Sequence, residues 1–179
     1  MNVPETPSPI EALDDDHRGL RIRFHWTGDR YAHTIEIVQE ADQPSLPPLL
    51  NSCESDASVE WPASPPVQQI SVEHIETNFV ALTVGSAGAC HWSISMLGYH
   101  NGDGPLLEFD VAARSSRPWD HLGSRYSIGP ASAGLAAEIF PGDAVPETVV
   151  EQTAGFWEIR PAQLDASTVR WAYQIRLAG

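Results

Sequence analysis

Apolar and polar side chains alternate one for one in segment after segment of this chain. The clearest case is the segment 20–26, in which every second residue is apolar: Leu20, Ile22, Phe24 and Trp26. Successive side chains of a β-strand point to opposite faces, so the pattern is typical of a strand with one buried face. No segment keeps an apolar period of 3.6 residues for ten residues, which argues against a long helix. The alternation therefore predicts a fold built from strands.

The segment 20–38 predicts a hairpin with a defined register. Glycine comes first in the two-residue loop Gly28-Asp29, as a type II′ turn prefers. Folding about this loop produces four cross-strand pairs on one face, namely Trp26 with Tyr31, Phe24 with His33, Ile22 with Ile35 and Leu20 with Ile37. Arg21 then lies opposite Glu36 on the other face. Because His33 falls on the apolar face, we expect a core histidine with a hydrogen-bond partner.

Shorter alternating segments follow to the end of the chain, and fifteen prolines and thirteen glycines separate them. We expect further strands at 69–74, 79–84, 89–96, 106–114, 125–128, 135–140, 148–151, 156–160 and 168–177. About ten strands joined by short turns predict an all-β fold with little helix. A single antiparallel β-sandwich is the favoured architecture, and a closed β-barrel is the alternative.

The sequence also predicts which later segments pair with each other. The segments 79–84 and 89–96 are expected to pair across Gly85–Ala89, which aligns Leu82 with Trp92 on the core face. The segments 156–160 and 168–177 are expected to form a closing hairpin. In its last strand one face is apolar, with Val169, Trp171, Tyr173, Ile175 and Leu177.

The two ends of the first hairpin adjoin less regular sequence. Residues 1–18 combine prolines with an Asp-Asp-Asp-His run, which predicts a flexible acidic arm before a single β domain at 19–179. The segment 39–69 contains six prolines among serines and acids, and we expect a long loop packed on the domain.

Charge excludes several partners and chemistries. Ten arginines and no lysine stand against 24 acidic residues, for a net charge of −14. Such a surface repels phosphate backbones and anionic lipid, so neither nucleic acid nor a membrane is an expected partner. The absence of lysine excludes Schiff-base chemistry and a P-loop. The first sixteen residues lack the basic and apolar regions of a secretory signal, so a cytoplasmic location with free thiols at Cys53 and Cys90 is expected.

Signatures of catalysis and of cofactor binding are absent. The sequence contains no GxSxG, GxGxxG, Walker A or EF-hand pattern. The two closest histidines are eight residues apart, so no local pair of metal ligands exists. We therefore predict neither a cofactor nor a metal ion.

One block of the sequence stands out as a candidate binding site. Within thirteen residues it gathers Arg114, Arg117, Trp119, Asp120, His121, Arg125 and Tyr126. Arginine forks beside an aromatic platform suit a small anionic or sugar-like ligand. The alternative is structural: Arg114 and Arg117 pair with the acidic excess, and Trp119 covers a sheet edge.

A second candidate is the polar face of the central strands, where the predicted pairing gathers His91, Ser93, Ser95, Glu108 and Asp110. In a barrel interior this set would line a cavity, whereas in a sandwich it would form an ordinary solvated sheet face.

Three functions fit these observations. The favoured one is a non-catalytic binding or interaction module for a protein, a carbohydrate or a small anion, because spacing assembles no nucleophile or metal site. An enzyme of carbohydrate or small-acid chemistry that uses carboxylates, histidine and arginine is the first alternative. A homo-oligomer joined through edge strands is the second.

Overall fold

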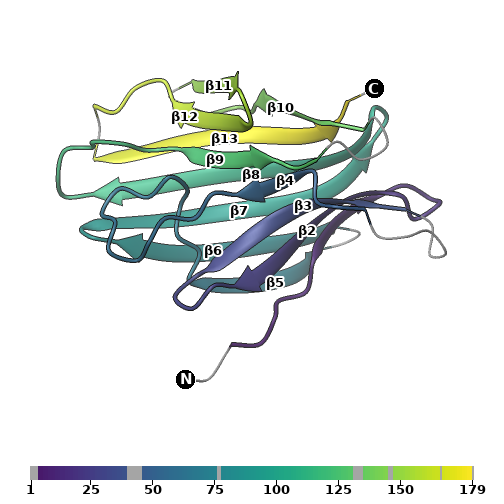
Figure 1. Ribbon diagram of the computed structural model, residues 1–179, viewed down its shortest axis with the longest axis horizontal. Helices are drawn as coiled ribbons and strands as arrows, with labels where there is room; N and C mark the ends of the chain where they lie inside the picture. Colours follow the sequence, from purple (N-terminus) through teal and green to yellow (C-terminus); the bar gives the residue numbers. More distant parts are fainter. Residues whose placement is uncertain are drawn as a thin grey trace.

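The computed structural model describes residues 4–39, 46–75, 78–130, 135–144, 147–165 and 167–178. Over these residues the protein is all-β, with thirteen strands in two antiparallel sheets and no helix (Figure 1). The sheets pack as a sandwich, which confirms the favoured architecture, and the barrel alternative is wrong. Among the described residues there is no helix that is long and apolar enough to cross a membrane.

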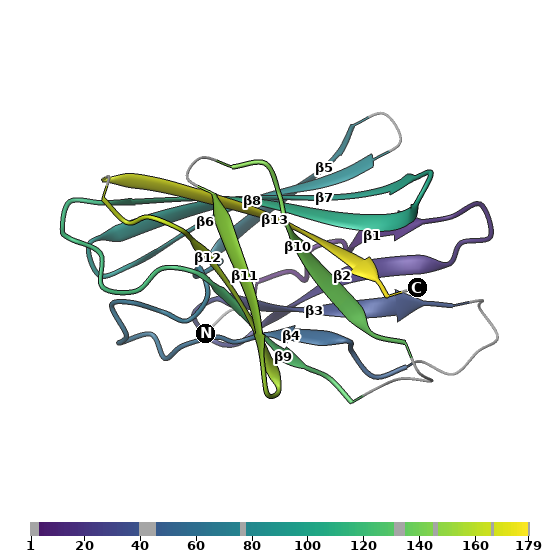
Figure 2. The same ribbon diagram turned by 90° about the horizontal axis from the view of Figure 1, so that it is seen from above.

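The two sheets form the two layers seen in Figure 2. One sheet has seven strands in the order β1 (Ile10–Leu13), β2 (Gly19–Trp26), β3 (Tyr31–Val38), β4 (Leu50–Ser52), β9 (Ser124–Ile128), β12 (Phe156–Pro161) and β11 (Thr148–Thr153). The other has six strands in the order β10 (Ala137–Pro141), β13 (Thr168–Leu177), β8 (Gly104–Ser115), β7 (Cys90–Asn101), β6 (Asn78–Ala87) and β5 (Gln69–Ile75). Cys53 and Cys90 are free thiols.

The hairpin of β2 and β3 has the predicted register, which is confirmed at every pair from Leu20–Ile37 to Trp26–Tyr31. Arg21 lies opposite Glu36 as predicted. Each side chain forms its ion pair with another residue. The partner of Arg21 comes from β1, which adds to the other side of β2, and the partner of Glu36 comes from β2 itself. Arg21 Nη2 lies 2.6 Å from Glu11 Oε1, and Arg23 Nε lies 3.1 Å from Glu36 Oε1.

The prediction that residues 1–18 form a solvated arm is wrong for Ile10–Leu13. These residues form β1, which pairs with β2 and buries Ile10 and Ala12. The backbone of β1 also crosses directly over Gly98 of β7, where an added Cβ would lie 2.3 Å from the carbonyl oxygen of Glu11. Strand β1 therefore closes one side of the sandwich. The predicted loop at 39–69 likewise contains a strand, β4, and residues 40–45 lie outside the described residues.

The predicted register of β6 and β7 is wrong by three residues. The turn is the two-residue loop Gly88-Ala89, with Gly88 at a φ of 55°, and Leu82 pairs with Ser95 instead of Trp92. An odd shift turns every side chain of a strand to the opposite face. Leu82 and Val84 therefore point outward and are 50% and 49% exposed, while Ala81 and Thr83 take the buried positions.

The predicted closing hairpin is also wrong, although both of its strands exist. Strand β12 pairs with β9 and β11, whereas β13 pairs with β8 and β10 in the other sheet. Their apolar residues face each other across the core, where Ile159 and Trp171 are both buried. The alternation of β13 itself is confirmed, since Val169, Trp171, Tyr173 and Ile175 are all buried.

A chain of polar groups joins the two sheets inside the core. His33 Nε2 lies 2.8 Å from the hydroxyl of Tyr126, which lies 2.7 Å from the hydroxyl of Tyr173. The ring of Tyr173 stacks on Phe109 at a centroid distance of 4.7 Å. Burial lowers the pKa of His33 to about 3, so the imidazole is neutral near pH 7. The predicted core histidine with a hydrogen-bond partner is confirmed.

Candidate functional site

The block 114–126 contributes mainly structural contacts at one end of the sandwich. Arg117 forms an ion pair with Glu60 from the β4–β5 loop. Trp119 contacts Trp61 of the same loop edge to face, with a centroid distance of 5.7 Å and an interplanar angle of 65°. Both tryptophans are half-buried against the core. These contacts support the structural interpretation of Arg117 and Trp119.

The other members of the block do not converge on one ligand. Tyr126 is buried and bonded to two core side chains, so its hydroxyl does not reach the surface. The Arg125 guanidinium lies 4.3 Å from the ring centroid of Phe156, and its Nε is 3.7 Å from Glu158 Oε1. His121 and Arg125 share the wall of a depression of about 20 Å³, which holds about one water molecule.

Arg114, Asp120 and His121 are exposed in the structure. A ligand-binding role for these three residues stays a prediction.

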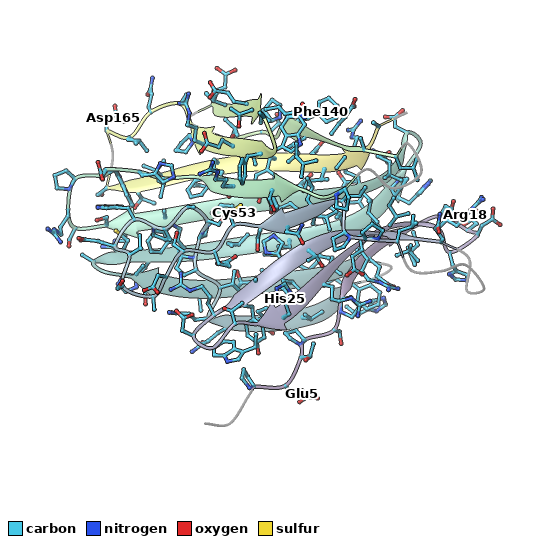
Figure 3. The ribbon with its side chains drawn as sticks, in the orientation of Figure 1. Glu5, Arg18, His25, Cys53, Phe140 and Asp165 are labelled. Carbon is cyan, nitrogen blue, oxygen red and sulfur yellow. The ribbon has the colours of Figure 1, made fainter. Side chains whose placement is uncertain are left out.

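A cleft of about 480 Å³ opens at the opposite end, which is the end of the labelled Arg18 in Figure 3. One wall comes from β1 and the turn after it, and the other from the ends of β6 and β7; the lining includes Glu11, Asp14, His17, Phe79, Tyr99 and His100. The sequence analysis missed this cleft because it assigned β1 to a flexible arm.

The two carboxylates of the cleft are already engaged. Asp14 Oδ1 accepts the backbone N–H groups of Arg18 at 2.8 Å and of Asp16 at 2.9 Å. The bond from Arg18 is the main cause of a lowered pKa at Asp14. Glu11 is held by Arg21. Over the described residues, no three histidine, cysteine or acidic side chains are grouped so as to hold a metal ion.

The outward face of the six-stranded sheet holds the second candidate set. The pairing of neighbouring strands aligns the outward side chains in rows that run across the sheet. One row contains Ser71, Leu82, Ser95 and Asp110, and the next contains Gln69, Val84, Ser93, Ala112 and Arg170. Since the sheet does not close into a barrel, this face is the outside of a sandwich. The corrected register of β6 adds Leu82 and Val84 to it, which the sequence analysis had placed in the core.

A depression of about 440 Å³ runs over this face. Leu82 and Val84 of β6 form one wall, and the ion pair of Asp110 with Arg170 forms the opposite wall. Between them lie the small side chains Ser93, Ser95 and Ala112, which leave the hollow. A second depression of about 360 Å³ adjoins it at Val84 and includes Gln69, Ser86 and His91. We call the first depression the β7 groove.

The two carboxylates in and beside the β7 groove both have side-chain partners. Asp110 is paired with Arg170. Glu108 Oε2 accepts hydrogen bonds from Gln174 Nε2 at 3.1 Å and from the Tyr99 hydroxyl at 3.3 Å. The face therefore offers aliphatic side chains, hydroxyl groups and carboxylates that are already engaged by partners of the same chain.

Comparison with known proteins finds no family model, no curated protein and no solved structure that matches this chain.

Proposed function

We propose that the protein is a non-catalytic interaction module that binds a partner protein through the outward face of its six-stranded sheet. The observation that carries this proposal is the exposure of Leu82 and Val84, at 50% and 49%, beside the β7 groove. An apolar patch with a polar rim is characteristic of interaction surfaces. Burying the exposed halves of both side chains would contribute roughly 1.5–3 kcal/mol to binding.

The arginines favour a protein partner over a small anion. At least eight of the ten arginines form ion pairs with carboxylates of the same chain: Arg18, Arg21, Arg23, Arg30, Arg117, Arg125, Arg160 and Arg170. An anionic ligand would have to compete with these carboxylates for the same guanidinium groups. The exposed aliphatic residues have no such competitor.

The chemistry of the β7 groove supports binding over catalysis. A catalytic serine needs a base within hydrogen-bond reach. In the described part of the chain, neither Ser93 nor Ser95 is hydrogen-bonded to a histidine or a carboxylate. The carboxylate of Asp110 forms an ion pair with Arg170, so its oxygen is already engaged by the guanidinium group.

Selection from a displayed peptide library tests the proposal. The immobilised protein should enrich peptides with apolar side chains, and Leu82→Glu should weaken their binding at least tenfold, because it places a charge on the apolar wall. The matched control is Val59→Glu, which changes an aliphatic residue of the β4–β5 loop that is 37% exposed. Enriched peptides that bind both variants as tightly as the wild type would refute the proposal.

A further inference from the structure

We infer that the cleft beside β1 is a second binding site and that its ligand is a neutral saccharide. The cleft has a volume of about 480 Å³, within the range of about 300–1,000 Å³ that is usual for ligand-binding clefts. It shares no lining residue with the β7 groove. The inference is therefore independent of the proposed function.

Backbone contacts hold the walls of the cleft in place. The turn after β1 is closed at Asp14, whose carbonyl oxygen accepts the N–H group of His17 at 3.0 Å and whose Oδ1 accepts that of Arg18 at 2.8 Å. Strand β1 itself lies against the end of β7, where Gly98 leaves no room for a Cβ (Figure 2). A cleft that is already formed has little ordering to undergo when a ligand binds, which favours affinity.

The two carboxylates of the cleft each keep one oxygen for a ligand. Arg21 binds only Oε1 of Glu11, with Nε and Nη2 both at 2.6 Å. Asp14 Oδ1 accepts two backbone N–H groups, while its Oδ2 lies 3.7 Å from Arg18 Nε, beyond hydrogen-bond distance. Glu11 Oε2 and Asp14 Oδ2 therefore accept no hydrogen bond from the described residues. A ligand hydroxyl group that donates to such an oxygen forms a strong, charge-assisted hydrogen bond.

Hydrogen-bond donors and an aromatic ring complete the cleft. The side chains of His17, Asn78 and His100 have no hydrogen-bond partner among the described residues, so their N–H groups can donate to sugar oxygens. His74 packs against the ring of Phe79 at a centroid distance of 4.8 Å, which holds that ring at the cleft. The face of an aromatic ring is electron-rich and attracts the C–H groups on the apolar side of a sugar ring.

Charge in the cleft favours a neutral ligand. An anion would be repelled by Glu11 and Asp14, and by the net charge of −14 of the whole chain. A cation would have to compete with Arg21 and Arg18, which already pair with these two carboxylates. A neutral saccharide meets neither obstacle, because its hydroxyl groups need only the donors and acceptors that remain.

NMR spectroscopy of the isotope-labelled protein tests the inference. The probes are neutral saccharides added one at a time: glucose, galactose, mannose, N-acetylglucosamine, maltose and cellobiose. At least one should produce saturable shifts in the backbone amides of residues 11–17, 78–79 and 98–100, which surround the cleft. The charged probes choline and glucuronate should produce none there. Saccharides that all leave these amides unchanged, or choline that alone shifts them, would overturn the inference.

Two variants test whether the shifts report binding in the cleft. Asn78→Ala and His100→Ala each remove one hydrogen-bonding side chain and should weaken saccharide binding about two- to tenfold. His25→Ala is the matched control and should leave the affinity unchanged, because His25 is an exposed histidine at the far end of β2. The same spectra show whether each variant is folded, so a loss of binding is separated from a loss of structure. A saccharide that binds both cleft variants as tightly as the wild type binds elsewhere, which would contradict the inference.

Discussion

Glu54 follows β4 and lies in a largely buried position beside the end of the first hairpin. Its Oε1 accepts a hydrogen bond from the Ser52 hydroxyl at 2.8 Å, while its buried Oε2 receives none from the described residues. Burial raises the pKa of Glu54 from 4.5 to about 7, against the opposing effects of Ser52 and of the Arg30 guanidinium. The carboxyl group is therefore held in a site that favours its neutral form.

The raised pKa has a direct consequence for stability. The folded state binds the proton more tightly than the unfolded state, so this stabilisation is fully present below pH 4.5 and is lost as the pH rises through about 7. Each tenfold change in acidity is worth about 1.4 kcal/mol, so the rise from 4.5 to about 7 corresponds to about 3 kcal/mol. Glu54→Gln keeps the shape and removes the titration. The variant should match the wild type near pH 4.5 and exceed its stability by up to about 3 kcal/mol at about pH 8.

Urea denaturation followed by tryptophan fluorescence measures the difference, provided that both proteins have equal m-values. Glu73→Gln is the matched control, because Glu73 is exposed on β5, and its effect should stay within about 0.5 kcal/mol at each pH. A stability difference between Glu54→Gln and the wild type that does not change with pH would refute the reasoning. So would a variant that is less stable than the wild type at about pH 8.

Three further predictions concern the core and the ends of the sandwich, each measured by urea denaturation with far-UV circular dichroism. Burial lowers the pKa of His33 from 6.5 to about 3, so the free energy of unfolding should fall by up to about 5 kcal/mol as the pH drops from 6.5 to about 3. His33→Phe should remove this part of the acid dependence. Gly98→Ala should lower the free energy of unfolding by about 1–3 kcal/mol, because the added Cβ meets the backbone of β1. A Cβ added at Gly102 meets nothing within 4 Å, so Gly102→Ala should be neutral. Equal stability of the two variants would contradict the close approach of β1. Trp119→Ala should lower the free energy of unfolding by roughly 2 kcal/mol. A double-mutant cycle with Trp61→Ala should give a coupling energy of about 0.5–1.5 kcal/mol between the two rings. Strictly additive effects would show that the ring contact contributes nothing.

The strand content and the first hairpin could be predicted from the sequence because both depend on local properties. Side chains alternate with a period of two along any strand, and a glycine in the first loop position selects the turn. These rules were sufficient for the pairing of Trp26 with Tyr31 and for the buried position of His33. The number of such strands indicated a β-sandwich or a closed β-barrel, and the structure decided between the two.

The partners of the later strands were decided only by the tertiary structure. Glycines at both 85 and 88 could begin the turn between β6 and β7, and the choice depends on which side chains fit beneath the other sheet. Strands β12 and β13 are neighbours in sequence, yet each completes a different layer, because their apolar faces bury each other across the core. Local alternation identifies one apolar side of a strand but not what covers it. The exposure of Leu82 and Val84, and with it the candidate interaction face, is therefore a property of long-range packing that the sequence pattern did not specify.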